Sequence, residues 1–283
     1  MSAHTGPIFL AYRGMSEIND LIAEIKKEEP LYDFSCEQEY ESETSIRHRV
    51  WKIGDSGDQS KEKVRRLAAY FAEVESLYVA DGHHRAASAV KAGLKRRQEN
   101  PAYTGEEEFN YFLSVLFPAE ELRIYDYNRV VHKLEMEVQN ILPEILKEKF
   151  EVKRMDTEYF RPKKKSEIGM YINHMWYCLT AKKEICSVDP VEGLDVSLLQ
   201  NHVLGPVLGI NEPKTDPRIQ FVGGIRGLGE LKKIVDSENG AAAFAMYPTS
   251  MEELLRTADK RRRWWVWSMM EHRRRSTMRQ RSR

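Results

Sequence analysis

Cysteine, long apolar runs and net charge are all scarce in this chain of 283 residues. No apolar run approaches the length of a membrane span, and the first residues are not typical of a signal peptide, so we expect a cytoplasmic protein with no membrane partner. A hydrophobic content of 41% and an aromatic content of 10% exclude a largely disordered chain. The cysteines lack the Cys-x-x-Cys spacing of a zinc or redox site, which favours reduced thiols at Cys36, Cys178 and Cys186.

The net charge of zero conceals an uneven distribution. From Lys260 onward the sequence has ten Lys and Arg residues and one acid, Glu271, so this tail carries +9 and residues 1–259 carry −9. Three tryptophans lie among the arginines, a composition that could bind nucleic acid or an anionic membrane. The alternative is a disordered, accidental tail that binds nucleic acid only non-specifically. We expect residues 260–283 to form such a tail outside the folded units.

The segment most informative about function joins an apolar run to a helical pattern. Residues 77–80 favour a buried strand, Gly82 permits a sharp turn, and alanines in residues 86–89 favour a helix. The first turn of a helix has unpaired N–H groups and a partial positive charge, and an arginine can add two hydrogen bonds to a phosphate. The pattern predicts a phosphate-binding strand–turn–helix with Gly82 at the turn and Arg85 in the first turn of the helix.

Two other interpretations of this segment stay open. Asp81 could cap the helix while the histidines are only solvated. A zinc site is the weaker alternative, because adjacent His83 and His84 would project in different directions and no nearby cysteine or acidic cluster completes a ligand set. We therefore expect no metal held by protein ligands alone. The Gly-Lys-Ser/Thr spacing of a Walker A loop is also missing.

The segment 81–85 (Asp-Gly-His-His-Arg) resembles the signature of the bacterial family catalogued as domain of unknown function 1015. It is similar to the glycine–arginine phosphate box of the ParB/sulfiredoxin-like superfamily, which includes free-serine kinases. Other segments fit the same family in the expected order: residues 6–13, 109–112, 116–118, 127–131, 221–227 and 247–250. The resemblance implies an α/β (α+β) fold, with a ParB/sulfiredoxin-like mixed-sheet core and a second α/β unit.

The resemblance also implies a nucleotide-dependent small-molecule kinase that, in intact relatives, phosphorylates the hydroxyl of free L-serine. Gly82, His83, His84 and Arg85 would then bind the phosphates, and Asp81, His83 and His84 would be catalytic. ATP or ADP would donate the phosphate, and Mg²⁺ would neutralise phosphate charge. The partners would be the nucleotide and a small amino acid. A catalytically inactive nucleotide-binding regulatory module is the alternative, and nucleic-acid binding through the tail is a third class.

Members of the family carry a further region ahead of the segment that corresponds to residues 6–9. By resemblance, that region supplies the remaining catalytic residues, and it is absent from this sequence. Family members also continue differently after Asp259. We therefore expect a truncated homologue with a shifted or spliced end that lacks part of the catalytic site.

A second motif, residues 218–227, has the same order of features: a predicted strand, a glycine turn, an arginine and a predicted helix. Gly223 and Gly224 would let backbone N–H groups approach a ligand, and Arg226 could pair with a carboxylate or phosphate. The alternative is a tight turn with a solvated arginine. Because both motifs are expected at the carboxyl end of a strand, we predict that Arg85 and Arg226 point into one polar cleft.

Weaker candidates for the same substrate-binding cleft are Asn128 and Arg129, which follow closely behind a predicted strand. Asp126 and Asp216 are the nearest acids to these motifs. The basic loop 161–165 could touch a phosphate or an acidic partner, although such runs are more often solvated.

The remaining pattern predicts the order of the elements. Residues 1–134 are expected to form a partial ParB/sulfiredoxin-like nucleotide-binding unit and residues 135–259 a second α/β unit. Strands are predicted at 6–12, 46–53, 77–80 and 110–117, with helices at 18–25, capped by Ser16, and 64–71. In the second unit we predict a helix at 138–146, a strand from 150, a strand pair around Asn173 and His174, and a helix at 194–204.

Overall fold

The computed structural model describes residues 6–36, 46–54, 57–237 and 241–260, and it divides the chain into two units between Leu122 and Arg123. This division falls earlier than the boundary expected after residue 134. The reason is β6 (Tyr127–Val131), which is hydrogen-bonded between two strands of the second unit. The expected basic tail, apart from Lys260, lies outside the described residues.

The first unit contains a mixed three-stranded sheet in the order β4 (Tyr78–Asp81), β1 (Ile8–Tyr12), β5 (Ser114–Pro118). The central strand β1 is antiparallel to β4 and parallel to β5, and most of its side chains are buried. These three strands confirm the strands predicted from the apolar runs. Two short 3₁₀ helices flank β5, η1 (Glu108–Asn110) and η2 (Ala119–Glu121).

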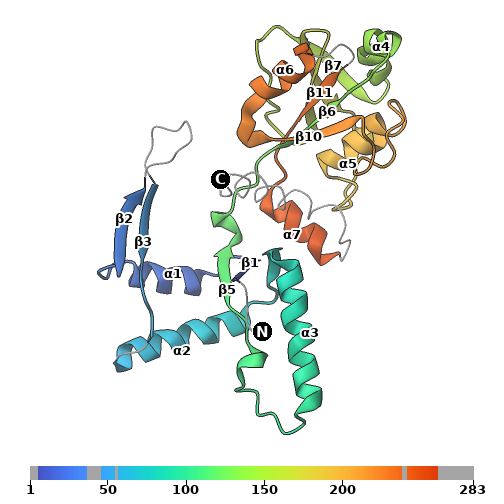
Figure 1. Cartoon of the computed structure of the whole chain (residues 1–283). Helices are drawn as coiled ribbons and strands as arrows, with labels where there is room; N and C mark the ends of the chain where they lie inside the picture. The colour runs from blue at the N-terminus through green and yellow to red at the C-terminus, as the bar shows by residue number, and fades with distance from the viewer. Residues whose placement is uncertain (1–5, 37–45, 55–56, 238–240, 261–283) are drawn as a thin grey trace, which may run out of the picture. The chain divides into compact units, whose positions relative to one another are not determined.

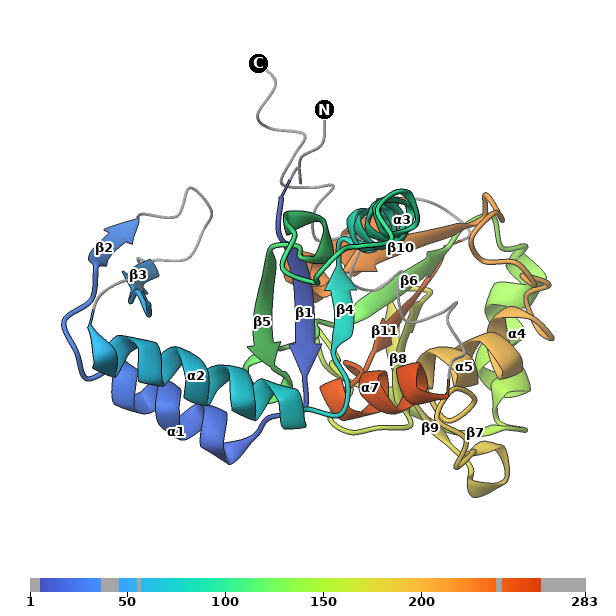
Figure 2. The same cartoon turned by 90° about the horizontal axis from the view of Figure 1, so that it is seen from below.

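Three helices accompany this sheet. The helices α1 (Ser16–Ile25) and α2 (Asp58–Glu73) run side by side in both views (Figures 1 and 2), and α3 (His83–Glu99) follows β4 directly. The stripe Ile18, Leu21 and Ile25 of α1 is buried, as its helical spacing predicts. The predicted cap is wrong: Met15 occupies the N-cap position, and the hydroxyl of Ser16 donates to the carboxylate of Glu17.

The sequence pattern did not predict the strand β2 (Tyr32–Cys36), which pairs with β3 (Ile46–Val50) in a separate two-stranded ribbon. All ten residues of the ribbon are exposed. Tyr32, Phe34 and Cys36 alternate with Asp33 and Ser35, a pattern typical of a strand, so the signal was present but was missed in a run of only five residues. Trp51 holds the base of the ribbon, since its indole N–H donates to the carbonyl of Glu28.

The second unit is built on a six-stranded sheet in which every neighbouring pair is antiparallel. The order is β10 (Ile219–Gly223), β6, β11 (Ala242–Met246), β8 (Glu167–Ile172), β9 (Met175–Ala181), β7 (Phe150–Met155). The predicted strand pair around Asn173 and His174 is confirmed as β8 and β9, and both turn residues have positive φ. Antiparallel pairing throughout makes this unit α+β.

Helices cover both faces of the six-stranded sheet (Figure 1). One face packs on α4 (Met136–Leu146), α5 (Asp195–Leu199) and the π turn η4 (Gln200–Leu204); the other packs on α6 (Gly227–Ser237). Strand β11 shows the alternation: Phe244 faces the first core, whereas Ala243 and Ala245 face the second. The remaining elements are η3 (Lys183–Ile185), η5 (Gly224–Arg226) and α7 (Met251–Asp259). In the described ranges, no helix has both the length and the apolar character needed to cross a bilayer.

Candidate functional site

The predicted strand–turn–helix is formed by β4, Gly82 and α3. Gly82 occupies the N-cap position with φ +90°, a conformation that side chains rarely adopt. No side chain caps α3, and its first turn contains no acid. The interpretation of Asp81 as the cap is therefore wrong, because Asp81 ends β4. A 17-residue helix whose first turn lacks a side-chain acceptor attracts an anion through its N–H groups and its dipole.

Arg85 folds back over this turn. Its Nη2 donates to Oδ2 of Asp81 at 3.0 Å, and the two side chains are 24% and 30% exposed. A Cβ on Gly82 would lie 2.8 Å from Nη2, and a Cβ on Gly6 would lie 3.0 Å from Nη1. The guanidinium thus occupies space that two glycines leave open. Gly6 was not among the predicted site residues, although it begins one of the segments that carry the family resemblance.

A β-bulge sets the direction of the strand end. Phe9 pairs with Asp81 and Leu10 pairs with Val79, so Ala80 is an extra residue in β4. Bulges re-aim the side chains next to them and are frequent at functional sites. His83 and His84, which follow the turn, are both exposed. In the part of the chain that the structure describes, no three or more His, Cys, Asp or Glu side chains gather in a way that could hold a metal ion.

The second motif also has its predicted local form, with β10, the turn η5 and α6 in succession. Arg226 is 58% exposed, and its Nη1 lies 3.9 Å from Oε1 of Glu230 one turn along α6. The N–H of Gly224 donates to the carbonyl oxygen of Asp126 at 2.7 Å, and a Cβ on Gly224 would lie 2.2 Å from Oδ1 of Asp126. Gly224 therefore allows the close approach of Asp126.

Asn128 is completely buried and binds other parts of the second unit. Its Nδ2 donates to Oδ2 of Asp126 at 2.8 Å, and its Oδ1 accepts from the backbone N–H of Met246 at 2.8 Å. Asp126 also accepts from Nη1 of Arg161, at 3.2 Å. The basic loop 161–165 thus contacts acids of its own unit, since Lys165 pairs with Glu253 as well. Apart from the bond between Asn128 and Asp126, these contacts join segments remote in sequence, and no local pattern predicted them.

Arg129 lies inside β6, not behind a strand as predicted, and is only 5% exposed. Its Nη1 donates to the carbonyl oxygen of Tyr127, and its Cζ lies 5.1 Å from the ring centroids of both Tyr127 and Phe221. Burial lowers the pKa of Arg129 to about 10. Within the described ranges, no carboxylate forms an ion pair with Arg129.

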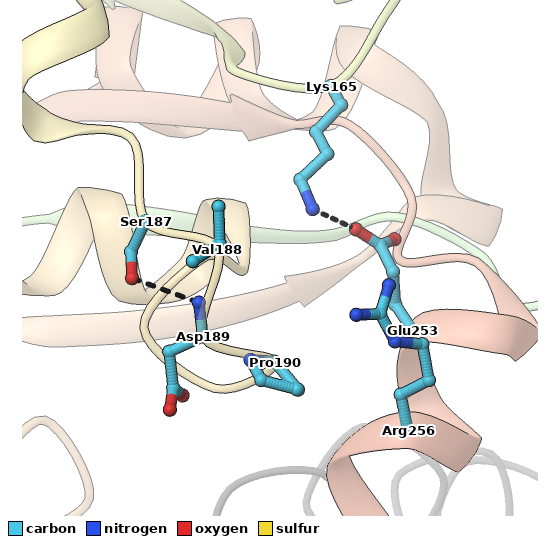
Figure 3. A pocket seen from close by; sticks show the side chains of 7 residues that line it. All are labelled: Lys165, Ser187, Val188, Asp189, Pro190, Glu253 and Arg256. Atoms are coloured by element: carbon cyan, nitrogen blue, oxygen red, sulfur yellow. Dashed lines mark hydrogen bonds and ion pairs between the residues drawn. The ribbon is translucent and has the colours of Figure 1, made fainter.

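The second unit also contains a cavity of about 220 Å³ that sequence reasoning missed (Figure 3). Its lining carries charges of both signs, from Lys165, Asp189, Glu253 and Arg256. The carboxylate of Glu253 already accepts from Lys165 and from the backbone N–H of Ser250. One oxygen of Asp189 accepts from two backbone N–H groups of the loop that follows it. Both acids therefore stabilise the local structure.

A family model described as protein of unknown function (DUF1015) matches residues 1–197 of this α+β protein. The chain therefore belongs to this family, as the segment 81–85 predicted. No curated protein and no solved structure matches the chain. The relation to ParB and sulfiredoxin, and the kinase activity it implies, remain predictions. Arg85 and Arg226 belong to different units, so the single cleft that they were expected to share also remains a prediction.

Proposed function

We propose that the chain binds the phosphates of a nucleotide, ATP or ADP, at the turn between β4 and α3. The observation that carries the proposal is the start of α3: it has no side-chain cap and no acid in its first turn, and it has Arg85 folded beside it. Backbone N–H groups and a guanidinium are the donors that phosphate oxygens require. Gly82 and Gly6 leave the room that the guanidinium of Arg85 needs beside the turn.

The residues at the turn also fit the Mg²⁺ that accompanies a nucleotide. Mg²⁺ between phosphates needs only one or two protein carboxylates, because water and phosphate oxygens supply its other ligands. Asp81 offers one carboxylate at the end of β4. When bound, the ion would neutralise phosphate charge, while Arg85 and the first turn of α3 would orient the phosphates.

The reaction proposed for the family is transfer of a phosphoryl group to the hydroxyl of a small amino acid, free L-serine by resemblance. Asp81, His83 and His84 are the candidates for assisting the transfer. The function would place the protein in the cytoplasm, where nucleotide and free amino acids are available. A nucleotide-binding regulatory module without turnover is the second candidate, and one contact favours it. The ion pair between Arg85 and Oδ2 of Asp81 favours a role of Asp81 in placing the phosphate-binding groups over a role in positioning an attacking hydroxyl.

Calorimetric titration of the full chain with ADP and with ATP, each with Mg²⁺, tests the binding. We expect Arg85→Met to weaken binding at least tenfold, about 1.4 kcal/mol, because a charge-assisted contact to phosphate is lost. Lys91→Met is the matched control, since it removes one positive charge from an exposed position on the same helix. Equal weakening in both variants would show that binding depends on the net positive charge of α3 and not on Arg85 itself. Absence of nucleotide binding by the unmodified chain would refute the proposal.

The two candidate functions separate in a second measurement. The chain that binds nucleotide is incubated with ATP or ADP and free serine, and phosphoserine is sought by mass spectrometry. Phosphoserine that disappears in Asp81→Asn supports the kinase. Nucleotide binding without any phosphoamino acid supports the module.

A further inference from the structure

We infer a second ligand site, in the second unit, at which Arg129 binds the oxyanion of a small molecule, a carboxylate or a phosphate, beside Gly223. The site is independent of the nucleotide proposed at Arg85, and the two belong to different units.

The first step of the argument is the unbalanced charge of Arg129. A guanidinium has five N–H donors, and the acceptor that the structure gives Arg129 is the carbonyl oxygen of Tyr127. The rings of Tyr127 and Phe221 offer partial compensation through their π faces. A cation that is nine-tenths buried is costly unless an anion and further acceptors accompany it. In the described part of the chain, none of the carboxylates is paired with Arg129, so an anion from outside would complete its environment.

The second step is open space on the same face of the sheet. Phe221 lies opposite Arg129 and Gly223 lies opposite Tyr127 in the antiparallel pair of β10 and β6. Residues two apart in a strand point to the same face, so a side chain at Gly223 would share the face of Phe221 and Arg129. A Cβ built on Gly223 would meet nothing within 4 Å. Diagonal neighbours of this kind are about 7–8 Å apart, within reach of a long side chain.

The chemistry of these groups identifies the class of ligand. The planar fork of a guanidinium matches the two oxygens of a carboxylate or phosphate. The stacked rings of Tyr127 and Phe221, 5.3 Å apart, give the site an apolar wall. Arg226, in the turn η5 that follows β10, is a poorer anchor, because it is exposed and lies near Glu230. The ligand is therefore a small organic molecule or inorganic ion that carries an oxyanion.

The experiment uses the full chain carrying Arg85→Met, so that the proposed nucleotide site does not contribute. Inorganic phosphate and malonate are titrated separately by calorimetry at constant ionic strength. Arg129→Met removes the cation, and Gly223→Val places a side chain in the open space, where its Cβ meets nothing within 4 Å. Arg226→Met is the matched control for the loss of an arginine from the same end of the sheet.

We expect phosphate or malonate to bind the Arg85→Met and Arg85→Met/Arg226→Met chains equally. Binding should fall at least tenfold when Arg129→Met or Gly223→Val is added. Tighter binding of phosphate would identify a phosphate ligand, and tighter binding of malonate a carboxylate ligand.

If Arg129→Met fails to fold, Gly223→Val still decides the outcome, since it leaves the guanidinium in place. Absence of binding to the Arg85→Met chain, or binding unchanged by Gly223→Val, would overturn the inference. The nucleotide proposal has its own measurement on the chain with Arg85 intact, so either proposal can fail alone.

Discussion

Gly224 and Asp126 are in closer contact than any side chain at position 224 would allow. The N–H of Gly224 donates to the carbonyl oxygen of Asp126 at 2.7 Å, and an added Cβ would lie 2.7 Å from that oxygen and 2.2 Å from Oδ1. The carboxylate of Asp126 is 4% exposed and is held by Asn128 and Arg161, so it has little freedom to move. The contact fixes the end of β10 against the start of β6.

Gly224→Ala should therefore lower the free energy of unfolding by about 1–3 kcal/mol, the usual cost of overpacking. Gly223→Ala is the matched control, because its Cβ meets nothing within 4 Å and its φ of −66° suits alanine. Urea denaturation of the two variants measures the difference. Similar stabilities for both would mean that Asp126 moves aside easily.

Replacing Gly82 should lower the affinity for nucleotide, whereas replacing Gly105, another glycine with positive φ, should lower only the stability. Gly82 and Gly105 both have positive φ, +90° and +102°, so an alanine at either position should cost about 1–2 kcal/mol. A Cβ at Gly105 meets nothing within 4 Å, whereas a Cβ at Gly82 meets the guanidinium of Arg85. We expect both variants to lose similar stability in urea, but only Gly82→Ala to weaken nucleotide binding in calorimetry. Equal affinities in the two variants would mean that the position of Arg85 is unimportant.

The sequence predicted the turn between β4 and α3 because its determinants are local. An apolar run, one glycine and a run of alanines lie within thirteen residues, 77–89. The same holds for the hairpin of β8 and β9, whose turn residues are adjacent. Local signals of this kind need no knowledge of the rest of the chain.

The environments of Arg129 and Asn128 could not be predicted in this way. Both lie in β6, which is buried because β10 and β11, about ninety residues or more along the chain, pair with it on either side. In the sequence, Arg129 lies two residues after Tyr127, a pattern that is equally compatible with an exposed loop. Gly223 and Gly224 are likewise indistinguishable in sequence, yet only Gly224 contacts Asp126. Such distinctions arise from long-range strand pairing.

Asp195 should make the second unit less stable as the pH rises through the weakly acidic range. It is buried at the start of α5, where its Oδ1 accepts from the N–H of Ser166 at 2.9 Å. Burial raises the pKa of Asp195 from 3.8 to about 6. The folded state therefore binds the proton more tightly than the unfolded state, and this stabilising contribution is complete below pH 3.8 and lost by about pH 6.

Asp195→Asn should remove this dependence, because asparagine keeps the oxygen acceptor and carries no charge. Above about pH 6 the variant should be roughly 2–3 kcal/mol more stable than the unmodified chain, and the two should converge near pH 4. Urea denaturation at a series of pH values measures the effect. Glu184→Gln, which removes an exposed carboxylate, controls for net charge. A constant difference in stability between the unmodified chain and the Asp195→Asn variant across the series would contradict the prediction.

Ser250 should contribute measurably to the stability of α7. Its hydroxyl accepts from the N–H of Glu253, and the Glu253 side chain accepts from the N–H of Ser250, which completes a capping box. Ser250→Ala should cost about 1 kcal/mol in urea denaturation, because the N–H of Glu253 loses its acceptor. Ser237→Ala, at the exposed end of α6, is the control, since that hydroxyl only donates to the carbonyl of Ile234. Equal effects of the two substitutions would show that the cap adds nothing.

The basic tail should account for any binding of nucleic acid by this chain. Residues 261–283 contain nine of the ten positive charges that follow Asp259, whereas residues 1–259 carry a net charge of −9. Truncation after Lys260 is the appropriate variant, because Lys260 is the C-cap of α7 and lies 3.5 Å from Asp189. Fluorescence anisotropy with a short DNA duplex of random sequence should show binding by the full chain and none by the truncated chain. Because counterion release governs such binding, an engagement of six or more phosphates would weaken it by about 10³-fold between about 50 and 200 mM salt. Salt-sensitive binding that survives truncation would instead place a nucleic-acid surface on the acidic body of the protein.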